Sequence, residues 1–184
     1  MVVLGISGSL RRGSHNARLL RAAARELPAG VELRIFDGLR DVPPYDEDGD
    51  RDPAPAAVTR LREAIAAADA VVIATPEYNS SIPGQLKNAL DWASRPFPGC
   101  SLRFTPVAVI GASTGAFGAV WAQAELRKVL GASGARVVKD ELGVGYAHEA
   151  FDSEGTLVDE DLRARVRALM AKLVDEARPA AVAA

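Results

Sequence analysis

The sequence predicts an α/β protein in which helices cover both faces of a parallel sheet. Short apolar runs alternate along the chain with stretches that carry apolar residues at helical spacing. One of these runs, residues 70–74, is uninterrupted, as is typical of a strand buried on both faces. Strands that alternate with helices favour parallel pairing through right-handed crossovers. We therefore expect a three-layer α/β/α sandwich with a sheet of five parallel strands.

The first strand, first helix and second strand follow one another directly. Val2–Ile6 is a short apolar run that ends at a glycine-rich turn, and residues 17–27 then place apolar side chains at helical spacing. The Pro-Ala-Gly segment 28–30 ends this helix. Residues 31–36 alternate apolar and polar side chains, which indicates a second strand.

A segment rich in Pro and Asp, residues 41–55, interrupts the alternation, which then resumes. The remaining expected elements are a helix over about 56–68, the strand 70–74, a helix over about 84–94, a strand over 106–110, a helix over 119–130, a strand over 136–138 and a helix over about 160–177. A chain of 184 residues fits one domain. We predict that this domain spans residues 1–178 and that the Ala-rich segment 179–184 is a flexible tail.

Composition and charge exclude several classes of protein. The formal net charge of −2 provides no long-range attraction to nucleic acid or to an anionic membrane. No apolar run approaches the roughly 20 residues that span a bilayer, and the first residues lack the pattern of a secretory signal. Because Cys100 is the only cysteine, no disulfide can form within the chain. These observations predict a cytoplasmic protein without nucleic-acid or membrane partners.

The sequence also lacks a pattern of metal ligands. His15 and His148 lie far apart, and only one cysteine accompanies them. The acidic run 46–52 places Arg51 where a calcium loop of the EF-hand type requires glycine. We therefore predict no metal site and interpret the acidic run as a solvated loop.

Three unusual loops follow the strands that end near Ile6, Ala74 and Ile110. The carboxyl ends of parallel strands lie at one edge of a sheet, and ligands bind at that edge near the switch in strand order. We therefore expect the three loops to meet there and to form one binding site.

The first loop has the features of an anion site. Residues 6–16 read Ile-Ser-Gly-Ser-Leu-Arg-Arg-Gly-Ser-His-Asn and stand directly before a helix. Glycines let the backbone approach a phosphate, hydroxyls donate to it, and a helix N-terminus attracts it. Arg11 or Arg12 adds a charge-assisted hydrogen bond. A surface loop whose polar residues cap the helix is the alternative interpretation.

Its spacing separates this loop from two common nucleotide motifs. Gly8 and Gly13 have the spacing of a P-loop, but Ser14 stands where that motif requires Lys. The Gly-x-Gly-x-x-Gly pattern of dinucleotide-binding folds is absent. Asp37, after the second strand, is either a ribose-binding acid or, more simply, a turn residue. A terminal phosphate monoester fits the hydroxyl-rich loop better than a buried pyrophosphate does.

The second and third loops have the features of a ring-binding site. Residues 75–84 read Thr-Pro-Glu-Tyr-Asn-Ser-Ser-Ile-Pro-Gly. Two prolines restrict this loop, and a rigid loop with free N–H groups and one aromatic side chain can hold a flat heterocycle such as the isoalloxazine of FMN. Residues 111–118 are mostly small and would let backbone lie against a ring edge. An ordinary glycine-rich connection explains the third loop equally well.

These loops resemble those of the NADPH-dependent FMN reductases of flavodoxin-like fold, a family that includes bacterial quinone, chromate and azo-dye reductases. Residues 8–16 are similar to the family's phosphate loop, and residues 75–92 are similar to its flavin-ring signature. The resemblance covers nearly the whole chain, and the second motif is long and specific. His15 stands where an aromatic residue is frequent in the family. Residues 43–46 are similar to a segment that shapes the substrate side or the subunit contacts in relatives.

The resemblance implies which residues bind the cofactor. Residues expected around the FMN phosphate are Ser9, Arg11, Ser14, His15 and Asn16. Residues expected to hold the isoalloxazine, largely through backbone, are Pro76, Glu77, Tyr78 and Asn79, with Ser113, Thr114 and Gly115 on the other side. No side-chain acid or base is required, so no catalytic residue is predicted. Relatives form homodimers and homotetramers, which makes the helix over 85–92 either a contact element or part of the core.

The function implied by the resemblance is an FMN-dependent NAD(P)H oxidoreductase. Electrons pass from NADPH, or from NADH, through bound FMN to a small acceptor in a ping-pong sequence; quinones, flavins, azo compounds and metal oxyanions are the candidates. One alternative is a flavodoxin-like electron carrier, although such carriers usually present a strongly acidic face and this chain has a net charge of only −2. The other is an NAD(P)-binding oxidoreductase without flavin, against which the missing glycine pattern argues.

Overall fold

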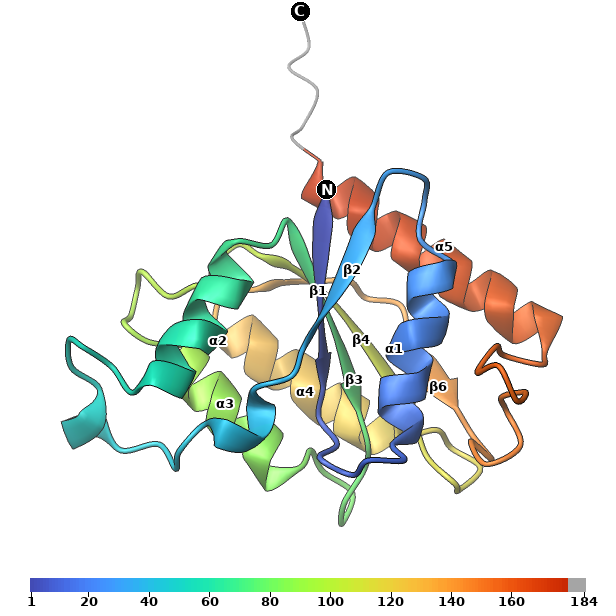
Figure 1. Ribbon diagram of the computed structural model, residues 1–184, viewed down its shortest axis with the longest axis horizontal. Coiled ribbons are helices and arrows are strands. Elements are labelled where there is room, and N and C mark those ends of the chain that lie inside the picture. Colours follow the sequence, from blue (N-terminus) through green and yellow to red (C-terminus); the bar gives the residue numbers. More distant parts are fainter. Residues whose placement is uncertain (179–184) are drawn as a thin grey trace, which may run out of the picture.

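A computed structural model describes residues 1–178 and places a parallel sheet between two layers of helices (Figure 1). The strands are β1 (Val2–Ser7), β2 (Glu32–Phe36), β3 (Ala70–Thr75), β4 (Pro106–Ala112), β5 (Arg136–Val137) and β6 (Leu142–Val144). The helices are α1 (His15–Arg25), α2 (Ala56–Ala66), α3 (Gly84–Ala93), α4 (Val120–Ala132) and α5 (Glu160–Ala177), with two short 3-10 turns, η1 (Leu39–Asp41) and η2 (Glu47–Gly49). The predicted tail, residues 179–184, lies outside the described residues.

The strand order confirms the predicted fold class. The sheet runs β2-β1-β3-β4-β5, with β6 also beside β4, and all its pairings are parallel. This is the order of flavodoxin-like sheets, in which ligands bind where the order reverses. Here that point lies between β1 and β3, and the loops that follow both strands lie at the same edge, at the bottom of Figure 1.

The fifth position of the sheet differs from the prediction. Instead of one strand over 136–138, two short strands occupy it: β5 pairs with the start of β4, and β6 pairs with its end. The amide of Val138 still donates to the Val107 carbonyl at 2.9 Å. The charged residues 139–141 then interrupt the pairing before β6 resumes it. The strand β6 was not predicted.

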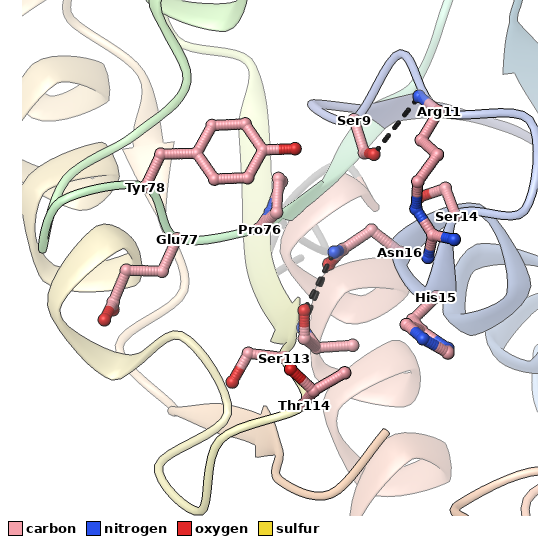
Figure 2. A pocket seen from close by; sticks show the side chains of 11 residues that line it. Ser9, Arg11, Ser14, His15, Asn16, Pro76, Glu77, Tyr78, Ser113 and Thr114 are labelled. Atoms are coloured by element: carbon pink, nitrogen blue, oxygen red, sulfur yellow. Dashed lines mark hydrogen bonds between the residues drawn. The ribbon is translucent and has the colours of Figure 1, made fainter. Parts of the chain in front are cut away.

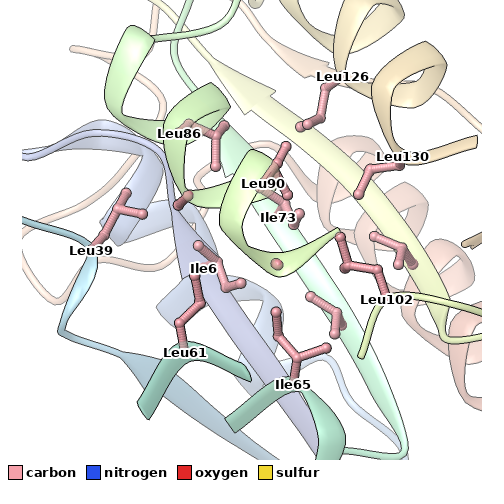
Figure 3. Close-up of a cluster of buried hydrophobic side chains, with 14 of the residues drawn as sticks. Ile6, Leu39, Leu61, Ile65, Ile73, Leu86, Leu90, Leu102, Leu126 and Leu130 are labelled. Atoms are coloured by element: carbon pink, nitrogen blue, oxygen red, sulfur yellow. The ribbon is translucent and has the colours of Figure 1, made fainter. Parts of the chain in front are cut away.

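The core lies on both faces of the sheet because its central strands are buried on both sides. In β3, Val71 and Ile73 belong to one hydrophobic cluster, and Val72 and Ala74 belong to the other. The first cluster packs α2, α3 and α4 against the sheet (Figure 3), and the second packs α1 and α5 against the opposite face. The side-chain period of two along β3 therefore builds the three layers.

Candidate functional site

A cavity of about 340 Å³ opens at the carboxyl edge of the sheet (Figure 2). It lies among the loops after β1, β3 and β4, as the positions of the unusual loops predict. Its walls are Ser9, Arg11, Ser14, His15, Asn16, Pro76, Glu77, Tyr78, Ala112, Ser113 and Thr114. These include ten of the twelve residues expected to bind the cofactor, whereas Asn79 and Gly115 do not line the cavity. Ala112 was not predicted because an alanine at a strand end carries no chemical signal.

The loop after β1 ends in a capped helix that points into this cavity. The hydroxyl of Ser14 accepts a hydrogen bond from the Ala17 amide at 3.2 Å, so that α1 begins at His15, two residues earlier than predicted. Ser14 is therefore the N-cap residue of α1, and the positive end of the helix dipole faces the cavity. At the start of the loop, Gly8 donates to the Ala74 carbonyl at 2.8 Å, which joins the loop to β3.

Asn16 lines the cavity, but its side-chain amide is already engaged. It donates to the Ala112 carbonyl and accepts from the Ala112 amide, both at 2.9 Å (dashed lines, Figure 2). Only 2% of Asn16 is exposed. Its side chain therefore connects the first turn of α1 with the end of β4, and it contributes to a ligand site by holding these two walls together.

His15 supplies an unpaired polar atom beside the arginines of the loop. Its Nδ1 is buried and has no hydrogen-bond partner within the protein. Burial lowers the pKa of His15 below its ordinary value, and the charges of Arg11, Arg18 and His148 lower it further. An imidazole surrounded by cations, together with the N-terminus of α1, forms a site that an anion would stabilise.

We expect the variant His15→Phe to resist acid better than the wild type does. Because the pKa of His15 is lowered in the folded protein, the unfolded chain binds the proton first as the pH falls. The free energy of unfolding therefore decreases from about pH 6.5, the ordinary histidine value, down to the lowered folded-state pKa. Phenylalanine cannot take up this proton. The test is the fall in melting temperature of each FMN-free protein between about pH 7.5 and pH 5.5, which should be smaller in the variant. An equal fall in both proteins would contradict the prediction.

The loop after β3 is rigid because it folds into a tight turn. Tyr78 and Ser81 exchange two backbone hydrogen bonds, of 3.0 and 3.1 Å. Between them, Asn79 and Ser80 have left-handed backbone conformations, with φ of 53° and 60°. A two-residue connection of this kind matches a type I′ turn. It carries Asn79 to the exposed tip and leaves the ring of Tyr78, which is 54% exposed, above the cavity (Figure 2).

The side chain of Glu77 caps a neighbouring helix. Its Oε2 accepts from the amides of Trp121 and Ala122, at 3.0 and 3.1 Å, in the first turn of α4. The residue before α4, Ala119, provides no side-chain cap of its own. Glu77 thus fixes the loop after β3 against α4.

Replacing Glu77 with alanine is expected to lower the free energy of unfolding by about 1–2 kcal/mol, since the change removes both a cap and a negative charge from a helix N-terminus. Glu77→Gln keeps a side-chain oxygen and should lose about half as much. Urea denaturation measures both. The control is Glu125→Ala, which removes a carboxylate from the body of α4 and should change stability by less than about 0.5 kcal/mol. If E77A and E125A lowered the free energy of unfolding equally, Glu77 would not stabilise α4 as a cap.

The loop after β4 is held by close contact with β6. The amide of Ser113 donates to the Val144 carbonyl at 3.0 Å, and the amide of Tyr146 donates to the Gly115 carbonyl at 3.1 Å. At Gly118, φ is +58°, and a Cβ added there would lie 2.5 Å from the backbone of Gly143. Gly115, which was expected to contact the flavin, therefore uses its carbonyl to attach this loop to the chain after β6.

Within residues 1–178, no group of three or more potential metal ligands occurs, and no helix there is long and apolar enough to cross a membrane. Cys100 is buried, with its Sγ 3.6 Å from the Ser133 carbonyl oxygen. Cys100 belongs to the segment that connects α3 to β4, and it is not among the residues that line the cavity.

The geometry fits an elongated ligand with an anionic end and a flat end. Arg11, the unpaired imidazole nitrogen of His15 and the N-terminus of α1 form one side of the cavity, and Pro76, Tyr78 and the loop after β4 form the other. FMN has this shape and charge. A flavodoxin-like sheet with such a site at its switch point defines a flavin-binding α/β protein.

Comparisons with known proteins identify the family. The profile of the NADPH-dependent FMN reductases matches residues 1–149, and the chain belongs to this family. It is 46% identical over 162 residues to an NAD(P)H-dependent FMN reductase of Pseudomonas aeruginosa, covering 88% of this chain and 86% of that one. It is 39% identical over 161 residues to a quinone reductase of Escherichia coli strain K12, covering 86% and 85%.

A solved structure agrees with this assignment. The flavoenzyme NAD(P)H:acceptor oxidoreductase FerB of Paracoccus denitrificans superimposes with a TM-score of 0.87 at 35% sequence identity, and the match covers 96% of both chains. The resemblance seen in the two sequence motifs is thereby confirmed over almost the whole chain.

Proposed function

We propose that the cavity binds FMN, with the phosphate at the first turn of α1 and the isoalloxazine between the loops after β3 and β4. The protein then acts as an NAD(P)H-dependent oxidoreductase, as expected for its family. The observation that carries this placement is the polarity of one cavity: its cationic side contains the unpaired Nδ1 of His15, and its other side is a rigid turn with one exposed aromatic ring.

The protein's own contribution is binding and orientation. When bound, FMN accepts two electrons from the nicotinamide and gives them to the acceptor, so no side-chain acid or base is needed. Ser9, Arg11 and the amides at the start of α1 bind the phosphate. The tight turn at residues 78–81 and the loop after β4 hold the ring so that one of its faces stays accessible. Nicotinamide and acceptor use this face in turn, which gives ping-pong kinetics.

The acceptor is proposed to be a small planar oxidant such as a quinone, a flavin or an azo compound; a metal oxyanion is a further candidate. Four aromatic side chains are exposed near the carboxyl edge: Tyr78, Phe117, Trp121 and Tyr146. The rings of Phe117 and Trp121 pack edge to face, with centroids 5.1 Å apart. Aromatic surface beside the cavity favours flat apolar acceptors, since stacking contributes beyond the burial of area.

The deciding experiment is a visible absorption spectrum. The purified protein is incubated with FMN, desalted and titrated without oxygen, first with NADPH and in a second sample with NADH. Retained flavin bands that bleach support the reductase. Bands that persist with both donors indicate an electron carrier, and the absence of retained flavin would refute the proposed FMN site. Parallel lines in double-reciprocal plots against quinone concentration test the ping-pong sequence.

We also propose that the protein is a cytoplasmic homodimer or homotetramer. The exposed aromatic residues at the carboxyl edge are the surface that a second copy would cover. A lone buried cysteine is consistent with a reducing compartment. Light scattering coupled to size-exclusion chromatography measures the mass, and Trp121→Glu is expected to shift the protein toward the monomer. A wild type that elutes as a monomer at micromolar concentration would refute this assembly.

A further inference from the structure

The loop that carries Ser9 and Arg11 has few hydrogen bonds to distant parts of the described chain, although the side chain of Leu10 packs against the core. Hydrogen bonds within the loop are local and mostly long: Ser7 and Ser9 interact at 3.3 and 3.4 Å, and the Arg11 amide donates to the Ser9 hydroxyl at 3.4 Å. Within the described part of the chain, one distant residue donates a hydrogen bond to residues 9–13. It is Arg40, whose Nη2 donates to the Leu10 carbonyl at 2.7 Å.

The position of Arg40 is itself fixed by α3. Arg40 lies in the turn η1, and the Nε2 of Gln85 donates to carbonyls on both sides of it, Leu39 at 2.7 Å and Val42 at 2.8 Å. Both Leu39 and Val42 are buried, so the ends of the turn are anchored in the core. Asn88 and Trp92 of the same helix hold the chain that follows: the Nδ2 of Asn88 and the Nε1 of Trp92 both donate to the Pro43 carbonyl, each at 2.8 Å.

The contact of Arg40 has a direct consequence for the loop. In a planar trans peptide the C=O and N–H groups point in opposite directions. Because Arg40 draws the Leu10 carbonyl outward, the amide of Arg11 in the same peptide unit points the other way, toward the Ser9 hydroxyl that lines the cavity (Figure 2). A cation on the carbonyl also polarises the peptide, and this strengthens its N–H as a donor.

We infer that Arg40 is a positioning residue for the flavin phosphate: it acts through the peptide between Leu10 and Arg11 and turns the Arg11 N–H toward the anion. This inference rests on the proposed placement of FMN. It also assigns a second task to the segment 84–93, whose sequence belongs to the flavin-ring motif. This helix starts beside the ring site and, through Gln85, supports the phosphate site as well.

The test compares FMN with riboflavin, which lacks the phosphate. Arg40→Met is expected to weaken FMN binding by about 3- to 10-fold, the range that one net hydrogen bond contributes. Riboflavin affinity should stay within about twofold, and the melting temperature of the FMN-free protein should not change, because Arg40 is exposed. Quenching of flavin fluorescence measures both affinities without any turnover.

Arg60→Met is the matched control. Arg60 lies near the same turn, pairs with Asp41 at 3.1 Å and is half exposed, but it does not contact the loop. The Arg60→Met change removes one positive charge, as Arg40→Met does, and it should leave the ratio of FMN affinity to riboflavin affinity unchanged. Equal ratios in R40M and R60M would show a general effect of charge and overturn the inference. If R40M lowers the melting temperature, R40Q is measured in its place against the same criteria.

The outcomes also separate this inference from the function on which it rests. A wild type that binds FMN no more tightly than riboflavin would overturn the proposed phosphate placement, and the role of Arg40 with it. A wild type that prefers FMN, with an R40M variant that prefers it equally, would overturn the role of Arg40 alone.

Discussion

Replacing Gly118 with alanine is expected to lower the free energy of unfolding by about 2–5 kcal/mol and to abolish flavin retention. At this position φ is +58°, which an L side chain adopts only with strain, and the new Cβ would lie 2.5 Å from the Gly143 carbonyl carbon and the Val144 amide. Backbone lies on both sides of this contact, so neither wall can yield by a side-chain rotation. The loop after β4 would have to move away from β6 and from the cavity.

The control for this variant lies in the same loop. A Cβ at Gly115 would find no atom closer than the Ser113 hydroxyl oxygen at 3.8 Å. Gly115→Ala should therefore change stability by less than about 0.5 kcal/mol. Urea denaturation gives the stabilities, and the absorption spectrum after desalting gives the retained flavin. A G118A protein that is as stable as G115A and still yellow would show that the contact with β6 is not tight.

Substituting Asn16 with leucine should have the second large effect, a loss of about 2–4 kcal/mol. The variant keeps a side chain of similar size but removes both hydrogen bonds to Ala112 in a place where only 2% of Asn16 is exposed. A buried polar group that loses its partner costs about 1–3 kcal/mol, and here both the carbonyl and the amide of Ala112 lose their partner. Chemical denaturation measures the loss, and Thr114→Val, at an exposed position on the same wall, is the control.

Asn16→Asp separates this supporting role from direct contact with the phosphate. The carboxylate can still accept from the Ala112 amide, but its second oxygen faces the Ala112 carbonyl, and it brings a negative charge to the side of the cavity proposed to hold the phosphate. FMN affinity should therefore fall more than riboflavin affinity does. If N16L were as stable as T114V, the interpretation of Asn16 as the connection between α1 and β4 would be wrong.

Much of the fold could be predicted because local patterns determine it. The apolar run at 70–74 identified the central strand, and the periodicity of the final helix matched α5 in its observed bounds. The prediction failed where the local sequence pattern did not indicate a strand that pairs in the sheet. Leu142 and Val144 are buried β residues, but glycines beside them and charges before them hide the short strand β6. The helix predicted over 119–130 extends to Ala132 in α4, because Gly131 lies inside the helix with free space around it.

The position of the cavity could be predicted, but the contacts made by its side chains could not. Loop composition and the rule that parallel strands end at one edge were enough to bring Ser9, Tyr78 and Ser113 to the same cavity. The engagements of Asn16 and Glu77 depend on partners 96 and 44 to 45 residues away. No local pattern contains such pairs, since they arise only when helices and strands pack.

The division of the fifth strand position has a consequence for aggregation. A long, unbroken edge strand offers a row of free N–H and C=O groups on which another chain can grow. Here one edge of the sheet consists of two strands of two and three residues, separated by the charged residues 139–141. At the opposite edge, β2 carries the exposed ion pair of Glu32 and Arg34. Extension of the sheet from copy to copy is therefore disfavoured at both edges, and the proposed homo-oligomer would have to form through helices and loops.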